Sequence, residues 1–192
     1  MFQVRIHGRG GQGVVSGAEL LSVAAFVEDH HAQAFPSFGS ERMGAPVMAF
    51  VRIDSKPIRL REPVLQPDAL IIQDPTLLHQ VDLFNGLRDD GIVLINSTRS
   101  IDELGLAEFA RERSRVRLVT VPATEIAVKH IGRAMPNVPL LGAFAAVCGQ
   151  VQLVSVLAAI ENKFAPKIAA GNVAAAREAY ERTLQMQEAA HA

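Results

Sequence analysis

The sequence predicts a three-layer α/β/α domain on a mostly parallel mixed sheet, with one antiparallel hairpin inserted near its start. Three observations support this fold class. Short, continuous apolar runs recur along the chain and are typical of strands that are covered on both faces. Segments with apolar residues at helical spacing follow them. Between the first strand and the first helix stands a loop with four glycines in six positions, residues 8–13.

The first unit is a strand, the glycine loop and a helix. Apolar and polar residues alternate over 2–7 and stop at Gly8, which predicts a short strand. From Val14 onward, apolar residues recur at helical spacing and predict a helix with a largely buried face. Residues 32–46 contain two prolines, two glycines and mixed charge without a sustained period, and they predict a long ordered loop.

An antiparallel hairpin is expected after this loop. Apolar and polar residues alternate over 47–53 and again over 58–61, and the turn sequence DSKP separates the two runs. The later elements are expected as strands at 68–75, 91–97 and 116–122, and as helices at 124–131, from about 140 with a bend near Gly149, and at 172–187. No linker or internal repeat divides the chain, so we expect a single domain over residues 1–192.

Composition limits the classes of function. At 192 residues and 49% hydrophobic, the chain can bury a substantial core, and its net charge of -1 provides no field that would attract nucleic acid. The single cysteine, Cys148, excludes an internal disulfide and a cluster held by four thiolates of this chain. No secretory signal is visible, and Pro139 interrupts the apolar stretch 138–160. A cytoplasmic protein that binds neither membrane nor nucleic acid is therefore expected.

The glycine loop has the spacing of a phosphate-binding turn. Gly8, Gly10 and Gly13 form G-x-G-x-x-G between a strand and a helix, where helix-terminal amides can hold a phosphate. A dinucleotide fold also needs an acidic residue after a second strand, whereas Glu28 and Asp29 fall at the end of the first helix. The loop lacks the lysine of a P-loop. It serves an anionic ligand, a partner chain or only a tight turn.

Four segments in order resemble a known family, and together they span nearly the whole chain. They read IHGRGGQGV, AFPSFGSERMGAPVMAFVRI, IRLREPVLQPDALIIQDPTL and NVPLLGAFA. These segments are similar to the gamma subunit of the 2-oxoacid:ferredoxin oxidoreductases, the pyruvate and 2-ketoacid type. The resemblance implies oxidative decarboxylation of a 2-oxoacid, of the pyruvate or 2-oxoglutarate type, to acyl-CoA, carbon dioxide and reduced ferredoxin.

The resemblance also implies that partner chains hold the catalytic cofactors. This chain has one cysteine and no GDG sequence followed by asparagine of the kind that thiamine enzymes use. Thiamine diphosphate, Mg and [4Fe-4S] clusters are therefore expected on the alpha, beta (thiamine-binding) and delta (ferredoxin-like) subunits, with ferredoxin as acceptor and CoA as co-substrate. The isolated chain is expected to be non-catalytic and to support assembly and contact with CoA.

Two loops contain the candidate residues for contact with CoA or with a neighbouring subunit. They are Gly8, Arg9, Gly10, Gly11, Gln12, Gly13, Ser40, Glu41 and Arg42. Arg9 and Arg42 are the candidate cations, either for a phosphate or for an ion pair between chains. No catalytic nucleophile and no metal site are expected. Asp74, at the end of a predicted strand, either faces a ligand crevice or caps a helix. The alternative function is a free-standing Rossmann-like module that binds a dinucleotide.

Overall fold

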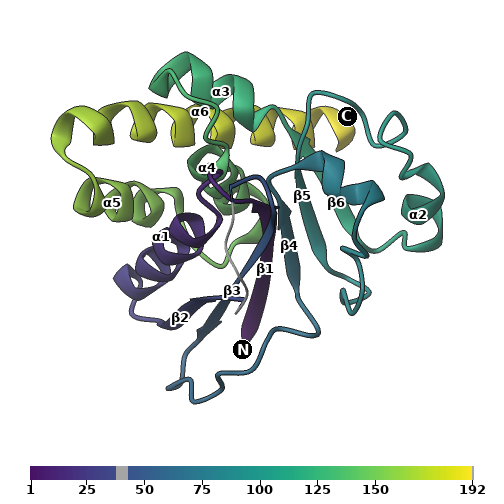
Figure 1. The fold of residues 1–192 in the computed structure, drawn as a ribbon, viewed down its shortest axis with the longest axis horizontal. Helices are drawn as coiled ribbons and strands as arrows, with labels where there is room; N and C mark the ends of the chain where they lie inside the picture. Colours follow the sequence, from purple (N-terminus) through teal and green to yellow (C-terminus); the bar gives the residue numbers. More distant parts are fainter. Residues whose placement is uncertain (38–42, 192) are drawn as a thin grey trace.

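The computed structural model describes residues 1–37 and 43–191, and over these residues the chain forms a six-stranded sheet in the order β2-β3-β1-β4-β5-β6 (Figure 1). Strands β1, β4, β5 and β6 run parallel, while β3 is antiparallel to both β1 and β2. The strands are β1 (Phe2–Arg9), β2 (His31–Pro36), β3 (Pro46–Asp54), β4 (Ala69–Ile72), β5 (Ile92–Asn96) and β6 (Arg117–Val121). The sheet is thus mostly parallel, as the sequence predicts.

Helices and loops cover both faces of this sheet. The helices are α1 (Val14–Val27), α2 (Ala107–Glu112), α3 (Ala123–Ile131), α4 (Asn137–Cys148), α5 (Leu153–Lys163) and α6 (Pro166–His191), with a 3-10 helix η1 (Pro75–His79). Alternate strand residues point to opposite faces, so Ile71 and Leu94 join the core under α1 and α4, while Leu70 and Val93 join the core under η1 and α2. The three-layer prediction is confirmed.

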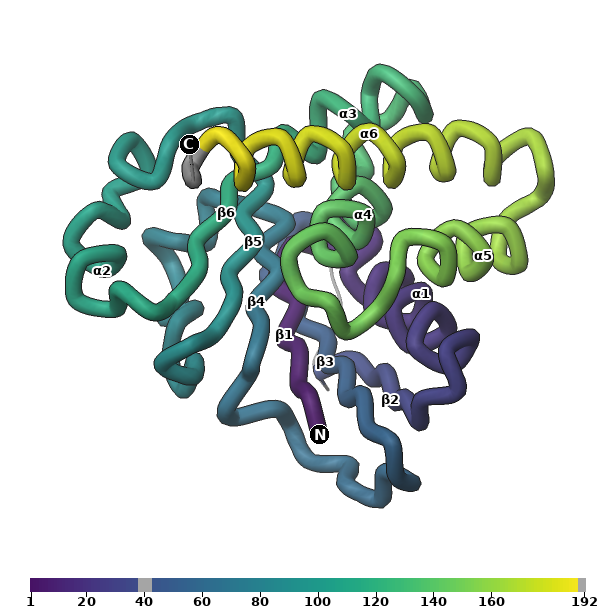
Figure 2. The backbone as a smooth tube through the Cα atoms, turned by 180° about the vertical axis from the view of Figure 1, so that it is seen from behind, coloured from purple at the N-terminus to yellow at the C-terminus, as the bar shows by residue number. Residues whose placement is uncertain are grey.

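The helical layer is much thicker on the first face. Helices α1 and α4 lie next to the strands, and α6 packs on α4, α3 and α5 from outside. Figure 2 shows α6 lying across the other helices. None of the helices in the described ranges combines the length and apolar character that crossing a bilayer requires. The predicted helix 172–187 is the central part of α6, which begins six residues earlier at Pro166.

The antiparallel hairpin is present, but its strands differ from the predicted ones. It pairs β2 with β3, so residues 31–36 form a strand where the sequence predicted the start of a long loop. Residues 58–61 form no strand. Because β3 lies between β1 and β2, both of its edges are occupied and a following strand has no partner there. Alanine-rich β2 has weak intrinsic strand preference, and its pairing with β3 decides its conformation.

The predicted bent helix near Gly149 is two separate helices. Helix α4 ends at Gly149, which has a φ of 67° and takes the left-handed conformation typical of a residue just after a helix. The chain resumes helical geometry only at Leu153. The glycine therefore stops the helix instead of bending it.

Two basic side chains of β1 are buried on the second face of the sheet. The Arg5 guanidinium donates to the carbonyl oxygens of Leu83 and Asn85, both at 2.8 Å. Its Nε donates to Nε2 of His7 at 3.0 Å. This network ties the first strand to the loop that follows η1, and it places a histidine against a buried cation.

Candidate functional site

The carboxyl ends of β1 and β4 meet at a point where the chain leaves the sheet toward opposite faces. After β1 it passes through the glycine loop to α1 on the first face, and after β4 it passes to η1 on the second. Figure 1 shows β1 rising from the N-terminus toward this edge. Diverging loops of this kind open the crevice in which α/β folds bind ligands. The glycine loop therefore lies at the topological switch point of the sheet.

Positive φ angles and close packing explain the glycines at 11 and 13. Gly11 has a φ of 94° and Gly13 a φ of 74°, in a region that side chains disfavour. A Cβ on Gly13 would lie 2.5 Å from Nδ2 of Asn137, the first residue of α4, and this nitrogen donates to the Gly13 carbonyl at 3.3 Å. The N-termini of α1 and α4 thus converge at Gly13.

Only part of the glycine loop's backbone can serve an external acceptor. The Gly10 amide donates to the Ala45 carbonyl at 2.9 Å, and the Gln12 amide donates to the Arg9 carbonyl at 3.0 Å. Within residues 1–37 and 43–191, the amides of Gly11 and Gly13 have no acceptor. Of the four amides from Gly10 to Gly13, two are therefore available within the described residues. Helix α1 adds its first turn, which has no side-chain cap and no acidic residue.

Asp74 links the glycine loop to the end of β4. Its Oδ2 accepts from Nε2 of Gln12 at 2.9 Å and lies 3.2 Å from Nε of Arg9. Its Oδ1 accepts from the Thr76 amide at 3.0 Å, which caps η1. Burial alone would raise the pKa of Asp74, but hydrogen bonds from Thr76 and Gln12 and the charge of Arg9 lower it below its usual value. Asp74 is therefore a carboxylate at neutral pH.

The structure places the first group of predicted site residues together and leaves the second group undescribed. Gly8 is the last but one residue of β1, and a Cβ there would lie 2.6 Å from the side chain of Val14, so β1 and α1 pack closely at this position. Ser40, Glu41 and Arg42 lie outside the described residues. Sequence reasoning missed Asn137 and Gln73, which flank the loop. Both are nearly fully buried, and Oε1 of Gln73 has no partner within the described residues.

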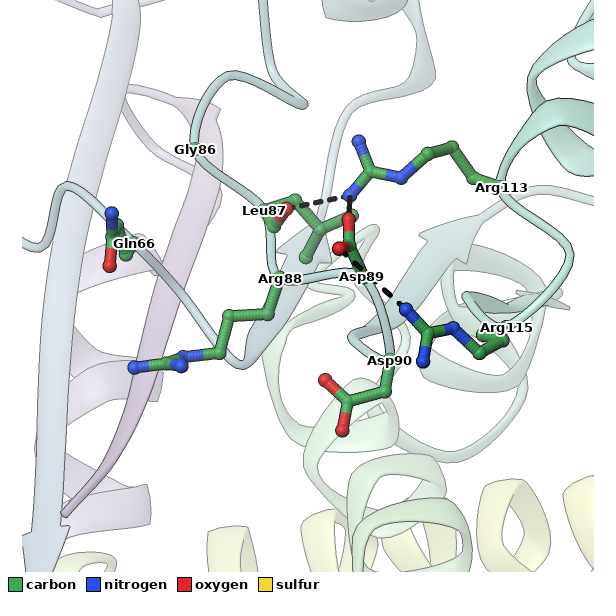
Figure 3. A pocket seen from close by; sticks show the side chains of 8 residues that line it. All are labelled: Gln66, Gly86, Leu87, Arg88, Asp89, Asp90, Arg113 and Arg115. Atoms are coloured by element: carbon green, nitrogen blue, oxygen red, sulfur yellow. Dashed lines mark hydrogen bonds and ion pairs between the residues drawn. The ribbon is translucent and has the colours of Figure 1, made fainter.

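A cavity of about 590 Å³ lies at the opposite edge of the sheet, before the first residues of β4, β5 and β6 (Figure 3). Each of the three arginines that line it pairs with an aspartate. Asp89 lies 3.2 Å from Arg113 and 3.7 Å from Arg115, and Arg88 lies 2.9 Å from Asp68. The arginines are thus neutralised by aspartates, which makes this cavity a weaker candidate for an anion than the glycine loop.

The described residues offer no donor set for a metal cofactor. Across residues 1–37 and 43–191, no three His, Cys, Asp or Glu side chains lie together as a metal ion would require. Burial raises the pKa of the Cys148 thiol to about 12, so it is protonated at neutral pH. The groups of residues 1–37 and 43–191 therefore suit neither an iron–sulfur cluster nor a thiolate nucleophile.

Comparisons of the sequence and of the structure with known proteins match the same family over most of the chain. The sequence matches the pyruvate ferredoxin/flavodoxin oxidoreductase family over residues 3–182. The common gamma subunit of the pyruvate/ketoisovalerate oxidoreductases of Pyrococcus abyssi is 45% identical over 183 residues, which cover 95% of this chain and 97% of that protein. The pyruvate synthase subunit PorC of Methanosarcina barkeri is 49% identical over 160 residues, 83% of this chain and 85% of that one. The crystal structure of the pyruvate oxidoreductase subunit PORC from Thermotoga maritima has a TM-score of 0.79 at 38% identity and covers 94% of this chain and 95% of its own.

Proposed function

This chain belongs to the pyruvate ferredoxin/flavodoxin oxidoreductase family as a gamma subunit, and we propose that it supports assembly of the complex and contacts CoA while partner subunits carry out the chemistry. The complex oxidatively decarboxylates a 2-oxoacid, of the pyruvate or 2-oxoglutarate type, and yields acyl-CoA, carbon dioxide and reduced ferredoxin. Its other chains are the alpha, beta and delta subunits.

The chemistry of this chain's side chains supports that division of labour. Thiamine diphosphate with Mg would supply the site of decarboxylation, and [4Fe-4S] clusters would carry the electrons. The single thiol of this chain is protonated at neutral pH. In the described part of the chain, no three His, Cys, Asp or Glu side chains lie close enough together to hold a metal ion. We therefore assign these cofactors to the partner subunits, with the thiamine cofactor on beta and the clusters shared with the ferredoxin-like delta subunit.

The observation that carries the CoA proposal is the set of donors at the switch point. The amides of Gly11 and Gly13 and the uncapped first turn of α1 favour an anionic oxygen, and CoA presents phosphates. The neighbouring carboxylate of Asp74 does not repel such a group strongly because Arg9 neutralises it at 3.2 Å. The loop thus offers backbone donors in nearly neutral surroundings, which suits a phosphate.

The sheet order argues against a free-standing dinucleotide-binding module. In that fold the strand beside β1 runs parallel to it and ends in an acidic residue that binds a ribose. Here β1 lies between β3 and β4, and the neighbour that comes from the segment after α1 is β3. Strand β3 is antiparallel to β1 and so ends at the opposite edge of the sheet. On the other side of β1, the parallel strand β4 is followed by Asp74, but both oxygens of this carboxylate are already bound, by Gln12 and Arg9 on one oxygen and by Thr76 on the other.

Substituting Gly11 by valine tests the CoA contact in the intact complex. A β-branched residue disfavours a φ of 94°, and a Cβ there would lie 2.9 Å from the Met43 side chain. We expect the KM for CoA to rise about tenfold, since one well-placed hydrogen bond to a charged group is worth about that factor. The KM for the 2-oxoacid is expected to stay unchanged.

Gly105→Val is the matched control, because Gly105 also has a positive φ, 75°, but has open space around it and lies in a distant loop. Loss of subunit co-purification at an unchanged KM for CoA would assign the loop to a subunit contact instead. Unchanged assembly and an unchanged KM together would reduce the loop to a tight turn.

A further inference from the structure

Each of the three nitrogens of the Arg9 guanidinium contacts a group of this chain, so four of its five N–H groups are used. Its Nε faces the Asp74 carboxylate at 3.2 Å, and its Nη1 donates to the Gly44 carbonyl at 3.0 Å. Its Nη2 donates to Oγ1 of Thr76 and Oε1 of Gln80, both at 2.8 Å. A guanidinium that bound a phosphate through its fork would have to give up several of these contacts. In this structure, the contacts of Arg9 are therefore intramolecular and join separate segments of the chain.

The contacts of Arg9 fasten the segment 43–45 onto the glycine loop. The Gly44 amide donates to the Gly10 carbonyl at 3.1 Å, and the Gly10 amide donates to the Ala45 carbonyl at 2.9 Å. Met43 forms a backbone bridge with Gly10. Through Gly44, Arg9 therefore connects this segment to the end of β4 and to η1.

The side chain of Gln12 completes the arrangement from within the loop. Its Oε1 accepts from the Arg9 amide at 2.8 Å, while its Nε2 donates to Asp74 at 2.9 Å. The carboxylate of Asp74 thus contacts both the Arg9 side chain and the side-chain amide of Gln12, which bridges the glycine loop. The Asp74 side chain is 13% exposed and that of Arg9 22%, so solvent screens their pair less than a surface pair.

We propose that Arg9 and Asp74 are positioning residues, whose ion pair clamps the segment 43–45 and Gln12 in place and so fixes the amides of Gly11 and Gly13 for CoA. This inference rests on the proposed CoA contact and assigns Arg9 a role other than phosphate ligand. The two roles predict opposite effects of removing the Asp74 charge. Without its carboxylate partner, a phosphate-binding Arg9 would bind CoA more tightly, whereas a clamp would loosen and bind CoA more weakly.

The test is a double-mutant cycle in the purified complex with Arg9→Met, Asp74→Asn and the combined variant. We expect each single variant to raise the KM for CoA about tenfold, and the double variant to raise it no further, because either change already opens the clamp. The KM for the 2-oxoacid and the kcat at saturating CoA should change little. Asp74→Glu restores the charge and should recover part of the affinity. A lower KM for CoA in Asp74→Asn, or additive effects, would overturn the proposal.

Hydrogen exchange in the same complexes measures the clamp without CoA. Peptides that contain the Gly10 and Gly44 amides should exchange faster in both single variants. Faster exchange with an unchanged KM for CoA would retain the clamp and overturn the proposed CoA contact, while unchanged exchange would overturn the clamp. Arg88→Met is the control. It breaks a comparable pair, at 2.9 Å from Asp68 on the opposite edge of the sheet, and should alter neither measurement.

Discussion

Replacing Gly142 by alanine is expected to lower the free energy of unfolding by about 3 kcal/mol, although alanine is the better helix former. Gly142 lies in α4, where α6 crosses it. A Cβ at this position would lie 2.1 Å from the backbone oxygen of Ala176 and 2.9 Å from its Cα. Backbone atoms cannot rotate away as a side chain can, so the two helices would have to separate.

The cost follows from where α4 lies. It packs between the sheet and α6, and its neighbouring residues Ala143 and Phe144 are fully buried. Moving α4 away from α6 presses it toward the strands, and moving α6 away opens gaps in the outer helical layer. Because Asn137 at the start of α4 packs on Gly13, a shift of α4 would also disturb the glycine loop.

Urea unfolding of the chain measures this loss of free energy. Thermal unfolding should show a fall in the melting temperature of about 6–12 °C for a domain of this size. Gly17→Ala is the matched control, since Gly17 is also inside a helix but its added Cβ would meet its nearest neighbour at 3.4 Å. We expect the control to change stability by less than about 1 kcal/mol. A Gly142→Ala variant as stable as the original chain would mean that α4 and α6 are further apart than described.

Local patterns were sufficient to predict the parallel strands and most helices, because each of these elements carries its own apolar spacing. Strands β4, β5 and β6 lie within the predicted runs, and α1 begins at Val14. Strand β2, the hairpin partner of β3, was missed because pairing between segments decides its conformation. The apolar alternation at 58–61 lies on a mostly exposed segment and forms no strand, because both edges of the preceding strand β3 are already occupied.

In the candidate site too, some residues could be predicted from local sequence and others depend on contacts between distant segments. The glycines at 11 and 13 could be found from sequence because a positive φ restricts the residue type at each position. Asn137 could not, since 124 residues separate it from Gly13 and only the packing of α4 on α1 brings them together. Arg9 was predicted in the glycine loop but is the last residue of β1, and its four acceptors come from two distant stretches, Gly44 and residues 74–80, which composition does not reveal.

Acid is expected to destabilise the chain through His7. Burial first, and the charge of Arg5 second, lower the pKa of His7 to about 3. Its Nε2 accepts from Nε of Arg5 at 3.0 Å, so the folded chain needs the neutral ring. In the unfolded chain the histidine has a pKa of about 6.5. Between these two values the unfolded state binds more protons, so stability is complete above about pH 6.5 and falls as the pH is lowered toward 3.

His7→Gln isolates this contribution because an amide oxygen can accept from Arg5 and does not titrate. Carboxylates also lose stabilising charge in acid, so the quantity to compare is the difference in unfolding free energy between the two proteins at each pH. From pH 7 to pH 4.5, the original chain should lose about 2–3 kcal/mol more than the variant, at about 1.4 kcal/mol per pH unit. Replacing the exposed His31 by glutamine should leave the original profile unchanged. Parallel pH profiles for His7→Gln and the original chain would show that His7 takes up its proton in the folded state, and that Arg5 does not hold the ring neutral.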